Sequence, residues 1–192
     1  MQLNNYIPSI ILASASPARK QLLTNAGIKV ITRPTDSDET INKPLTAKET
    51  VHTLATRKME SYFSKYQKDK IPVLTCDTLV YYGNTPYGKA KSFNDAINML
   101  STFSGNYHYV YTGYSLYYNG QIFSGSDQAK VFFKKLNLQE IEAYLNTGEY
   151  LNAAGSYRIQ GLASAFIDHV EGDLATVIGI PMNLLLKTVE KN

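Results

Sequence analysis

Residues 10–23 of the chain read Ile10-Ile11-Leu12-Ala13-Ser14-Ala15-Ser16-Pro17-Ala18-Arg19-Lys20-Gln21-Leu22-Leu23. The apolar run at residues 10–13 is typical of a short strand that is covered on both faces. Ser16 is a favourable N-cap, and Pro17 then falls at the first helical position, where its missing N–H costs nothing. Gly27 is placed to end the helix in a left-handed conformation. The segment therefore predicts a buried strand that turns directly into a helix.

The turn between this strand and helix is suited to bind an anion. Backbone N–H groups at a helix N-terminus point outward, and the helix dipole favours negative charge there. The hydroxyls of Ser14 and Ser16 and the cation of Arg19 add further donors. The turn predicts a phosphate site, although it lacks the glycines and the spacing of a P-loop. An ordinary capped helix with a solvated arginine explains the same residues, and this segment alone does not separate the two interpretations.

Strand-like and helix-like segments alternate along the rest of the chain. Strands are predicted at residues 28–32, 71–82, 107–118, 121–123 and 131–133, and helices begin near residues 46, 92, 137 and 181. We expect loops at residues 33–44 and 85–91, and a strand lining a cleft within residues 155–170. The alternation predicts an α/β fold with a mixed, twisted β-sheet flanked by helices. With 192 residues, the chain is long enough for one domain over residues 1–192, with two lobes around a central cleft.

Composition and charge exclude several classes of protein. A hydrophobic content of 44% and a charged content of 18% are those of a globular chain and not of a disordered one. A formal net charge of +3 without a concentrated basic block is no footprint of a nucleic-acid-binding protein. Cys76 is the single cysteine, which excludes an intramolecular disulfide and a multi-cysteine metal site. The sequence shows neither a secretory signal nor an apolar span of membrane length, so we expect a cytoplasmic protein.

Two charged residues fall where the pattern predicts burial. Lys58 follows Leu54 by four residues and Val51 by seven, which places it on the apolar stripe of its helix. Asp77 interrupts the apolar run of its strand. Because an unpaired buried charge is costly, both residues need an explanation. Snorkelling of Lys58 to the surface and a structural ion pair of Asp77 are the simpler ones, yet Asp77 is the residue that we would most readily assign to function.

Short motifs spread from near Ile10 to Leu186 are specific in combination. In chain order they are Leu12-Ala13-Ser14-Ala15-Ser16-Pro17-Ala18-Arg19, Asp38-Glu39-Thr40, Arg57-Lys58, Asp77-Thr78-Leu79-Val80, Lys89, Ser104-Gly105 through Tyr111-Thr112-Gly113, Ala154-Gly155-Ser156-Tyr157, Ile159-Gln160-Gly161, Glu171-Gly172-Asp173 and Gly179-Ile180-Pro181. Together they resemble the Maf family of nucleoside triphosphate pyrophosphatases, once described as septum formation inhibitors. Each motif alone is weak evidence, but this many in the family's order are strong evidence.

The resemblance implies a Maf/ITPase-like fold and an enzyme that hydrolyses a nucleoside triphosphate to the monophosphate and pyrophosphate. It also implies a divalent metal cation, Mg²⁺ or Mn²⁺. Such a reaction needs cations around the triphosphate and a carboxylate that holds metal and prepares water. The residues that the resemblance places against the phosphates and the adjoining parts of the substrate are Ser14, Ser16, Ala18 and Arg19.

Four further residues take catalytic roles by the same resemblance. Lys58 and Lys89 neutralise the charge that develops across the bridging oxygen. Glu39 and Asp77 hold the metal, and Asp77 is the best candidate for the base that activates water. Removing such a base commonly lowers the rate by about 10²–10⁴.

Thr78 and the segment that contains Gln160 resemble the dTTP/UTP branch of the family. This resemblance implies that the enzyme prefers a pyrimidine base. A glutamine amide offers both a donor and an acceptor to the edge of a uracil or thymine ring. The branch that acts on 7-methyl-GTP resembles this one closely, and it tends to carry Gln and Glu at these two positions. The sequence therefore favours pyrimidine triphosphates, including modified ones.

Several positions depart from the pattern of the pyrimidine branch. Ala18 stands where that branch usually has arginine, and the segment Gly155-Ser156-Tyr157 looks more like the other branch. Ala90 replaces the usual proline after the motif lysine, and Ala153 replaces a lysine that could contact substrate. The loss of this lysine is expected to broaden specificity or to lower activity.

Two other classes of function remain open. One is a non-catalytic, nucleotide-binding regulator of septum formation that would act through partner contacts in cell-division arrest. The other is a related α/β pyrophosphatase for inosine or xanthosine triphosphate. The full set of carboxylates and cations argues against a pure binder. The main prediction is an enzyme that removes surplus or non-canonical nucleotides, with a small nucleotide as its partner, no nucleic acid or membrane, and a homodimer as the assembly that the resemblance allows.

Overall fold

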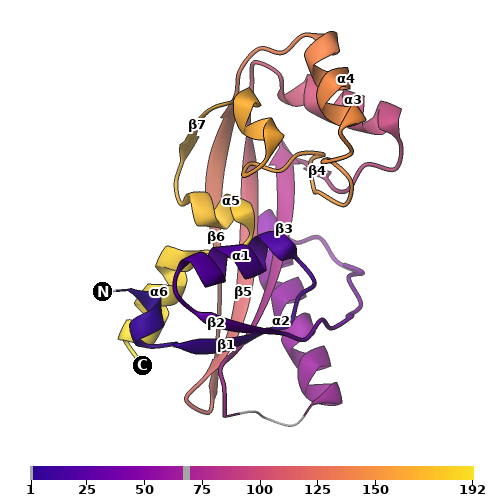
Figure 1. The fold of residues 1–192 in the computed structure, drawn as a ribbon. Helices are drawn as coiled ribbons and strands as arrows, with labels where there is room; N and C mark the ends of the chain where they lie inside the picture. Colours follow the sequence, from indigo (N-terminus) through magenta and orange to yellow (C-terminus); the bar gives the residue numbers. More distant parts are fainter. Residues whose placement is uncertain (1, 67–69) are drawn as a thin grey trace. The chain divides into compact units, whose positions relative to one another are not determined.

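The computed structural model describes residues 2–66 and 70–192 (Figure 1). These residues form two compact units. Unit 1 takes residues up to 77 together with 112–127 and 179–192, and unit 2 takes residues 78–111 and 128–178. The predicted single domain over residues 1–192 stays a prediction.

The strands form a mixed sheet, as the sequence predicts. In order across the sheet they are β2 (Lys29–Thr32), β1 (Ser9–Leu12), β3 (Val73–Tyr82), β5 (Tyr107–Tyr118), β6 (Gln121–Phe133) and β7 (Ile167–Glu171), with β4 (Thr85–Tyr87) paired to β3. β1 pairs in parallel with both β2 and β3, whereas the β3–β4 and β6–β7 pairs are antiparallel. The predicted α/β class with a mixed sheet flanked by helices is therefore confirmed.

Unit 1 covers β1 on both faces. Ile10 and Leu12 belong to a buried cluster with side chains of α1 (Pro17–Asn25) and α6 (Met182–Glu190), whereas Ile11 and Ala13 pack with α2 (Ala47–Lys65). Alternate residues of a strand point to opposite faces of the sheet, and this explains the unbroken apolar run at residues 10–13. The 3₁₀ helix η1 (Leu3–Asn5) joins the first cluster through Leu3, close to α6 in Figure 1.

Local capping signals in unit 1 act as predicted. The Ser16 side chain accepts a hydrogen bond from the Arg19 N–H at the start of α1, with Pro17 at the first helical position. Gly27 follows the helix with φ of 77°, a left-handed conformation that suits glycine. Thr46 and Glu49 form a reciprocal capping box at the start of α2.

Unit 2 is built around its own apolar cluster. Phe103 of α3 (Phe93–Phe103) lies fully buried in it, together with side chains from α4 (Leu138–Asn146) and from the unit 2 portions of β3, β5 and β6. His108 of β5 is also buried and forms a 2.8 Å hydrogen bond with the Tyr157 hydroxyl. Burial lowers the pKa of His108 to about 3, so this histidine is neutral and has a structural role.

The structure corrects three expectations for local structure. Residues 85–87 form β4 and not a loop, because the turn at Gly83 brings them back against the end of β3. β6 is one continuous strand over Gln121–Phe133, where the sequence predicts two short ones. Residues 155–161 form turns, followed by the 3₁₀ helix η2 (Leu162–Phe166), so the strand expected within residues 155–170 is limited to β7; the short helix α5 (Leu174–Ile178) comes after it.

Within residues 2–66 and 70–192, no helix has the length and apolar character that a membrane crossing requires.

Candidate active site

The turn before α1 brings the predicted phosphate-binding residues together. The Ser14 hydroxyl accepts hydrogen bonds from the Ser16 N–H at 3.2 Å and from the Arg19 guanidinium at 3.2 Å. The Ser16 hydroxyl caps the helix by accepting from the Arg19 N–H at 3.3 Å. Ser14, Ser16, Ala18 and Arg19 are all partly exposed. Their donors therefore lie at a helix N-terminus that a phosphate could approach.

Arg19 is held in place by the backbone of two distant segments. Its Nε donates to the Gly179 carbonyl at 2.9 Å, and its Nη1 donates to the Cys76 carbonyl at 3.0 Å. The alternative of a solvated arginine is therefore wrong. The guanidinium ties the start of α1 to the residue before Asp77 in β3, which fixes the phosphate turn relative to the carboxylate.

Lys58 joins the two predicted metal-binding carboxylates. Its Nζ lies 2.5 Å from Asp77 Oδ1 and 2.9 Å from Glu39 Oε1. Asp77 follows Val73 and Thr75 on the face of β3 toward α2, where the Thr75 hydroxyl donates to the Ala55 carbonyl. The side chains of Lys58 and Asp77 are only 16% and 10% exposed. Snorkelling of Lys58 is therefore wrong, and this lysine pairs inside the protein.

Burial and pairing act in opposite directions on Lys58. Burial lowers its pKa, but the neighbouring Asp77 charge and hydrogen bonds to Asp77 and Glu39 outweigh this effect, so the pKa lies above its usual value. Lys58 is therefore a cation at neutral pH. Glu39 differs from its two partners because its side chain is 63% exposed.

The other predicted residues belong to unit 2. Thr78 is partly exposed in β3, and Lys89 is exposed and pairs through its backbone with Ala154. This pairing brings Lys89 next to the motif that begins at Ala154. Gln160 is exposed in the turn before η2. The participation of Thr78, Lys89 and Gln160 in one site with the unit 1 residues stays a prediction.

The turn that carries Gln160 is anchored by Glu149. The Glu149 carboxylate accepts from the Leu162 N–H at 2.9 Å and from the Ala163 N–H at 3.3 Å. A Cβ on Gly161 would lie 2.3 Å from that carboxylate, which explains the glycine of this motif. Arg158 donates to the carbonyl of Glu149 at 2.9 Å and completes the anchor. No local pattern in the sequence marks Glu149, so its role as an anchor is visible only in the structure.

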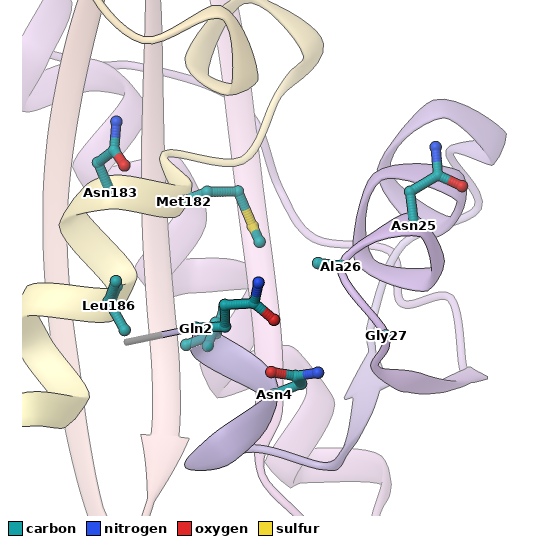
Figure 2. A pocket seen from close by; sticks show the side chains of 9 residues that line it. Gln2, Asn4, Asn25, Ala26, Gly27, Met182, Asn183 and Leu186 are labelled. Carbon is teal, nitrogen blue, oxygen red and sulfur yellow. The ribbon is translucent and has the colours of Figure 1, made fainter.

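A pocket in unit 1 lies away from these charges. It has a volume of about 420 Å³, and the residues that line it are Gln2, Leu3, Asn4, Asn25, Ala26, Gly27, Met182, Asn183 and Leu186 (Figure 2). It adjoins the C-terminal end of α1, whereas the phosphate turn adjoins the N-terminal end. Because no charged side chain lines it, we do not assign it to a triphosphate.

The carboxylates suit a divalent cation that is shared with the substrate. Mg²⁺ prefers oxygen ligands and is usually held by one or two carboxylates together with waters and substrate phosphates. Glu39 and Asp77 supply two carboxylates near one point, and a carboxylate oxygen that bonds to lysine keeps further lone pairs. Within the described part of the chain, no group of three or more His, Cys, Asp or Glu residues could hold a metal on its own.

The reactivity of Cys76 reports how well β3 is buried. Burial raises the pKa of its thiol to about 11, so at pH 8 roughly one molecule in a thousand carries the reactive thiolate. We expect iodoacetamide to alkylate the folded protein at pH 8 about 100-fold more slowly than the urea-unfolded protein. The chain has one cysteine, so intact mass reports this reaction directly. Equal rates in the two states would contradict the buried environment of β3.

Comparisons with known proteins identify the family. A family model described as Maf-like protein matches residues 9–192. The chain belongs to the Maf family. Three similar proteins, each named a dTTP/UTP pyrophosphatase, come from Pyrococcus abyssi, Desulforamulus reducens and Aquifex aeolicus. They are 38%, 37% and 35% identical to this chain, over 94%, 92% and 95% of its length and 95%, 92% and 94% of theirs.

Membership of the Maf family gives the scattered motifs a common context. Within unit 1, the structure joins the acidic loop, the Arg57-Lys58 motif and Asp77 through hydrogen bonds and ion pairs. It also gives Gly179 of the last Maf motif a contact, the Arg19 side chain. Arg57 and Gly179 belong to motifs of the sequence whose pattern alone assigns neither residue a role.

Proposed function

We propose that this Maf protein is a nucleoside triphosphate pyrophosphatase that acts on dTTP and UTP. The observation that carries the proposal is the Lys58 ammonium between the carboxylates of Asp77 and Glu39, in the same unit as the phosphate turn of α1. The relatives named dTTP/UTP pyrophosphatase support the same substrates. Because these relatives match nearly the whole chain, the proposal assigns the pyrophosphatase reaction to this chain as a whole.

The reaction breaks one phosphoanhydride bond. Water attacks the α-phosphorus, the bond from this phosphorus to the α–β bridging oxygen breaks, and pyrophosphate leaves with that oxygen. Asp77 accepts the proton of the attacking water. Lys58 stays protonated beside it and offsets negative charge, an effect that is stronger at a partly buried site than in water. Lys89 offsets the charge on the leaving pyrophosphate.

The phosphate turn orients the substrate. Ser14, Ser16 and Arg19 bind phosphate oxygens through hydroxyl, backbone and guanidinium donors. Arg19 is already fixed by Gly179 and Cys76, so little side-chain entropy is lost when phosphate binds. Ala18 lacks the guanidinium that the pyrimidine branch usually has at this position. We therefore expect this protein to bind the phosphates more weakly than relatives that have arginine at this position.

Glu39 and Asp77 would hold Mg²⁺ or Mn²⁺ together with the substrate phosphates. When bound, the cation polarises a phosphoryl oxygen and lowers the pKa of its water. The protein places one buried and one exposed carboxylate at this position. Glu39 reaches this position from a loop with an exposed side chain, whereas the Asp77 side chain lies buried on a strand.

Base selection is assigned to unit 2. Gln160 reads the edge of the uracil or thymine ring through its amide, with Thr78 beside the base. The anchor from Glu149 keeps the Gln160 turn rigid, which favours one base shape over others. The proposal includes a location in the cytoplasm, where such nucleotides are made. It also includes assembly as a homodimer without bound nucleic acid.

Pyrophosphate release from a panel of triphosphates tests the proposal. The panel contains dTTP, UTP, 5-methyl-UTP, 7-methyl-GTP, ITP and XTP, each with Mg²⁺, with Mn²⁺ and with a chelator. We expect the highest kcat/KM for dTTP and UTP, loss of activity in the chelator, and monophosphate and pyrophosphate in equal amounts. Thymidine diphosphate and inorganic phosphate as products would contradict cleavage of the α–β bond.

The other outcomes separate the alternatives. Preference for 7-methyl-GTP, which Gly155-Ser156-Tyr157 would favour, would move the protein to the other branch. Preference for ITP or XTP would indicate the purine pyrophosphatase. Binding of dTTP without release of pyrophosphate at any metal concentration would support the non-catalytic regulator of septum formation.

A further inference from the structure

Glu39 occupies a segment that has little structure of its own. Residues 33–46 link β2 to α2 without helix or strand. Because the Glu39 side chain is mostly exposed, its ion pair with Lys58 alone is too weak to fix the loop. The position of the Glu39 carboxylate therefore depends on contacts that hold its backbone.

Arg57 makes such contacts on both sides of Glu39. Its Nη1 donates to the Thr40 carbonyl at 2.6 Å and to the Asp38 carbonyl at 3.3 Å. The Asp38 carboxylate accepts from the Thr40 N–H at 2.9 Å and closes a tight turn around Glu39. Two consecutive residues of α2 therefore contact different parts of this turn. Arg57 binds the backbone on both sides of Glu39, and Lys58 binds the Glu39 carboxylate.

The rest of the loop is attached one turn further along α2. The Ser61 hydroxyl donates to the Asp36 carbonyl and lies 3.0 Å from the Thr35 hydroxyl. These contacts fix the segment before Asp38, but they do not reach the residues that flank Glu39. Arg57 is the residue through which α2 contacts the backbone of the turn at residues 38–40.

We propose that Arg57 is a positioning residue that places the Glu39 carboxylate for metal binding and catalysis. This inference rests on the proposed function, because it assigns Glu39 to the bound cation. Arg57 acts through the loop carbonyls and does not need to touch substrate. A guanidinium suits this role better than an ammonium, because its planar donors can serve two acceptors in a fixed geometry.

Replacing Arg57 should weaken metal binding more than it lowers the stability of the protein. For Arg57→Met, we expect the Mg²⁺ concentration at half-maximal activity to rise roughly 10–100-fold, as is typical when a group that orients a metal ligand is lost. Arg57→Lys should recover part of this loss, since one ammonium can still donate to a carbonyl. Lys48→Met removes the same charge from an exposed position on α2 and should leave the Mg²⁺ dependence unchanged.

A double mutant separates positioning from a general effect. If Arg57 acts through Glu39, then Arg57→Met should have little further effect on kcat/KM in a Glu39→Gln background. Additive losses, or an Arg57→Met enzyme with the Mg²⁺ dependence of Lys48→Met, would overturn the inference while the proposed function stands.

Hydrogen exchange of the metal-free protein gives a readout that is independent of activity. We expect the amide of Thr40 to exchange about tenfold faster or more in Arg57→Met than in Lys48→Met, because the turn loses a charge-assisted hydrogen bond. Equal exchange in the two variants would overturn the inference. If the wild-type protein released pyrophosphate from no triphosphate, the proposed function would fail, and the exchange comparison would still decide whether Arg57 holds the Glu39 turn.

Discussion

Asp77→Asn should reduce pyrophosphate release from dTTP by about 10²–10⁴-fold at saturating metal. Asparagine has nearly the same shape as aspartate and can still accept a hydrogen bond from Lys58, but it can neither take a proton from water nor neutralise a cation. The loss should therefore fall on kcat, with a smaller change in KM. Single-turnover measurement of pyrophosphate and monophosphate, with Mg²⁺ titrated to saturation, separates slow chemistry from weak metal binding.

Asp168→Asn is the matched control for this change. Asp168 is an exposed carboxylate of β7 that contacts His169, so its loss removes the same charge from an element of unit 2, whereas the Lys58 cluster belongs to unit 1. We expect activity within about twofold of the wild-type value, in line with the small effect of surface ion pairs. A folded Asp77→Asn protein with full turnover would show that Asp77 is not the base.

Local capping explains why much of the fold could be predicted. Ser16 with Pro17, and Thr46 with Glu49, satisfy helix N–H groups within three residues, so the sequence contains the whole interaction. β4 has only three residues, too few to show a strand periodicity, and β6 continues as one strand because it pairs with segments distant in the sequence, such as β7. Such non-local pairing leaves only a weak signal in the sequence.

The sequence predicts which residues belong to the candidate site better than it predicts which of them contact each other. Helical spacing placed Lys58 on the inward face of α2, but it could not show that its partners come from residues 19 positions away in either direction. The resemblance to the Maf family named Glu39 and Asp77, whereas the contacts of Arg57 and Arg19 with backbone carbonyls carry no side-chain pattern. Contacts of this kind become visible only when the fold brings the segments together.

Gly113→Ala should strongly destabilise unit 1. A Cβ at this position of β5 would lie 2.2 Å from the Val51 carbonyl oxygen and 2.7 Å from the His52 backbone nitrogen of α2. These are backbone atoms of a helix, so no side-chain rotation relieves the overlap, and α2 must move away from the sheet. Overpacking typically costs about 1–3 kcal/mol and occasionally more. We expect about 3 kcal/mol here, which corresponds to a fall in Tm of roughly 6–12 °C for a chain of this size.

Gly88→Ala provides the comparison, because a Cβ on Gly88 meets no atom within 4 Å. Its Tm should stay close to that of the wild-type protein, and differential scanning calorimetry of both variants measures the contrast. Since α2 carries Lys58, displacement of this helix should also lower dTTP hydrolysis in Gly113→Ala at temperatures where the protein is still folded. A Gly113→Ala protein as stable and as active as Gly88→Ala would show that β5 and α2 do not approach each other this closely.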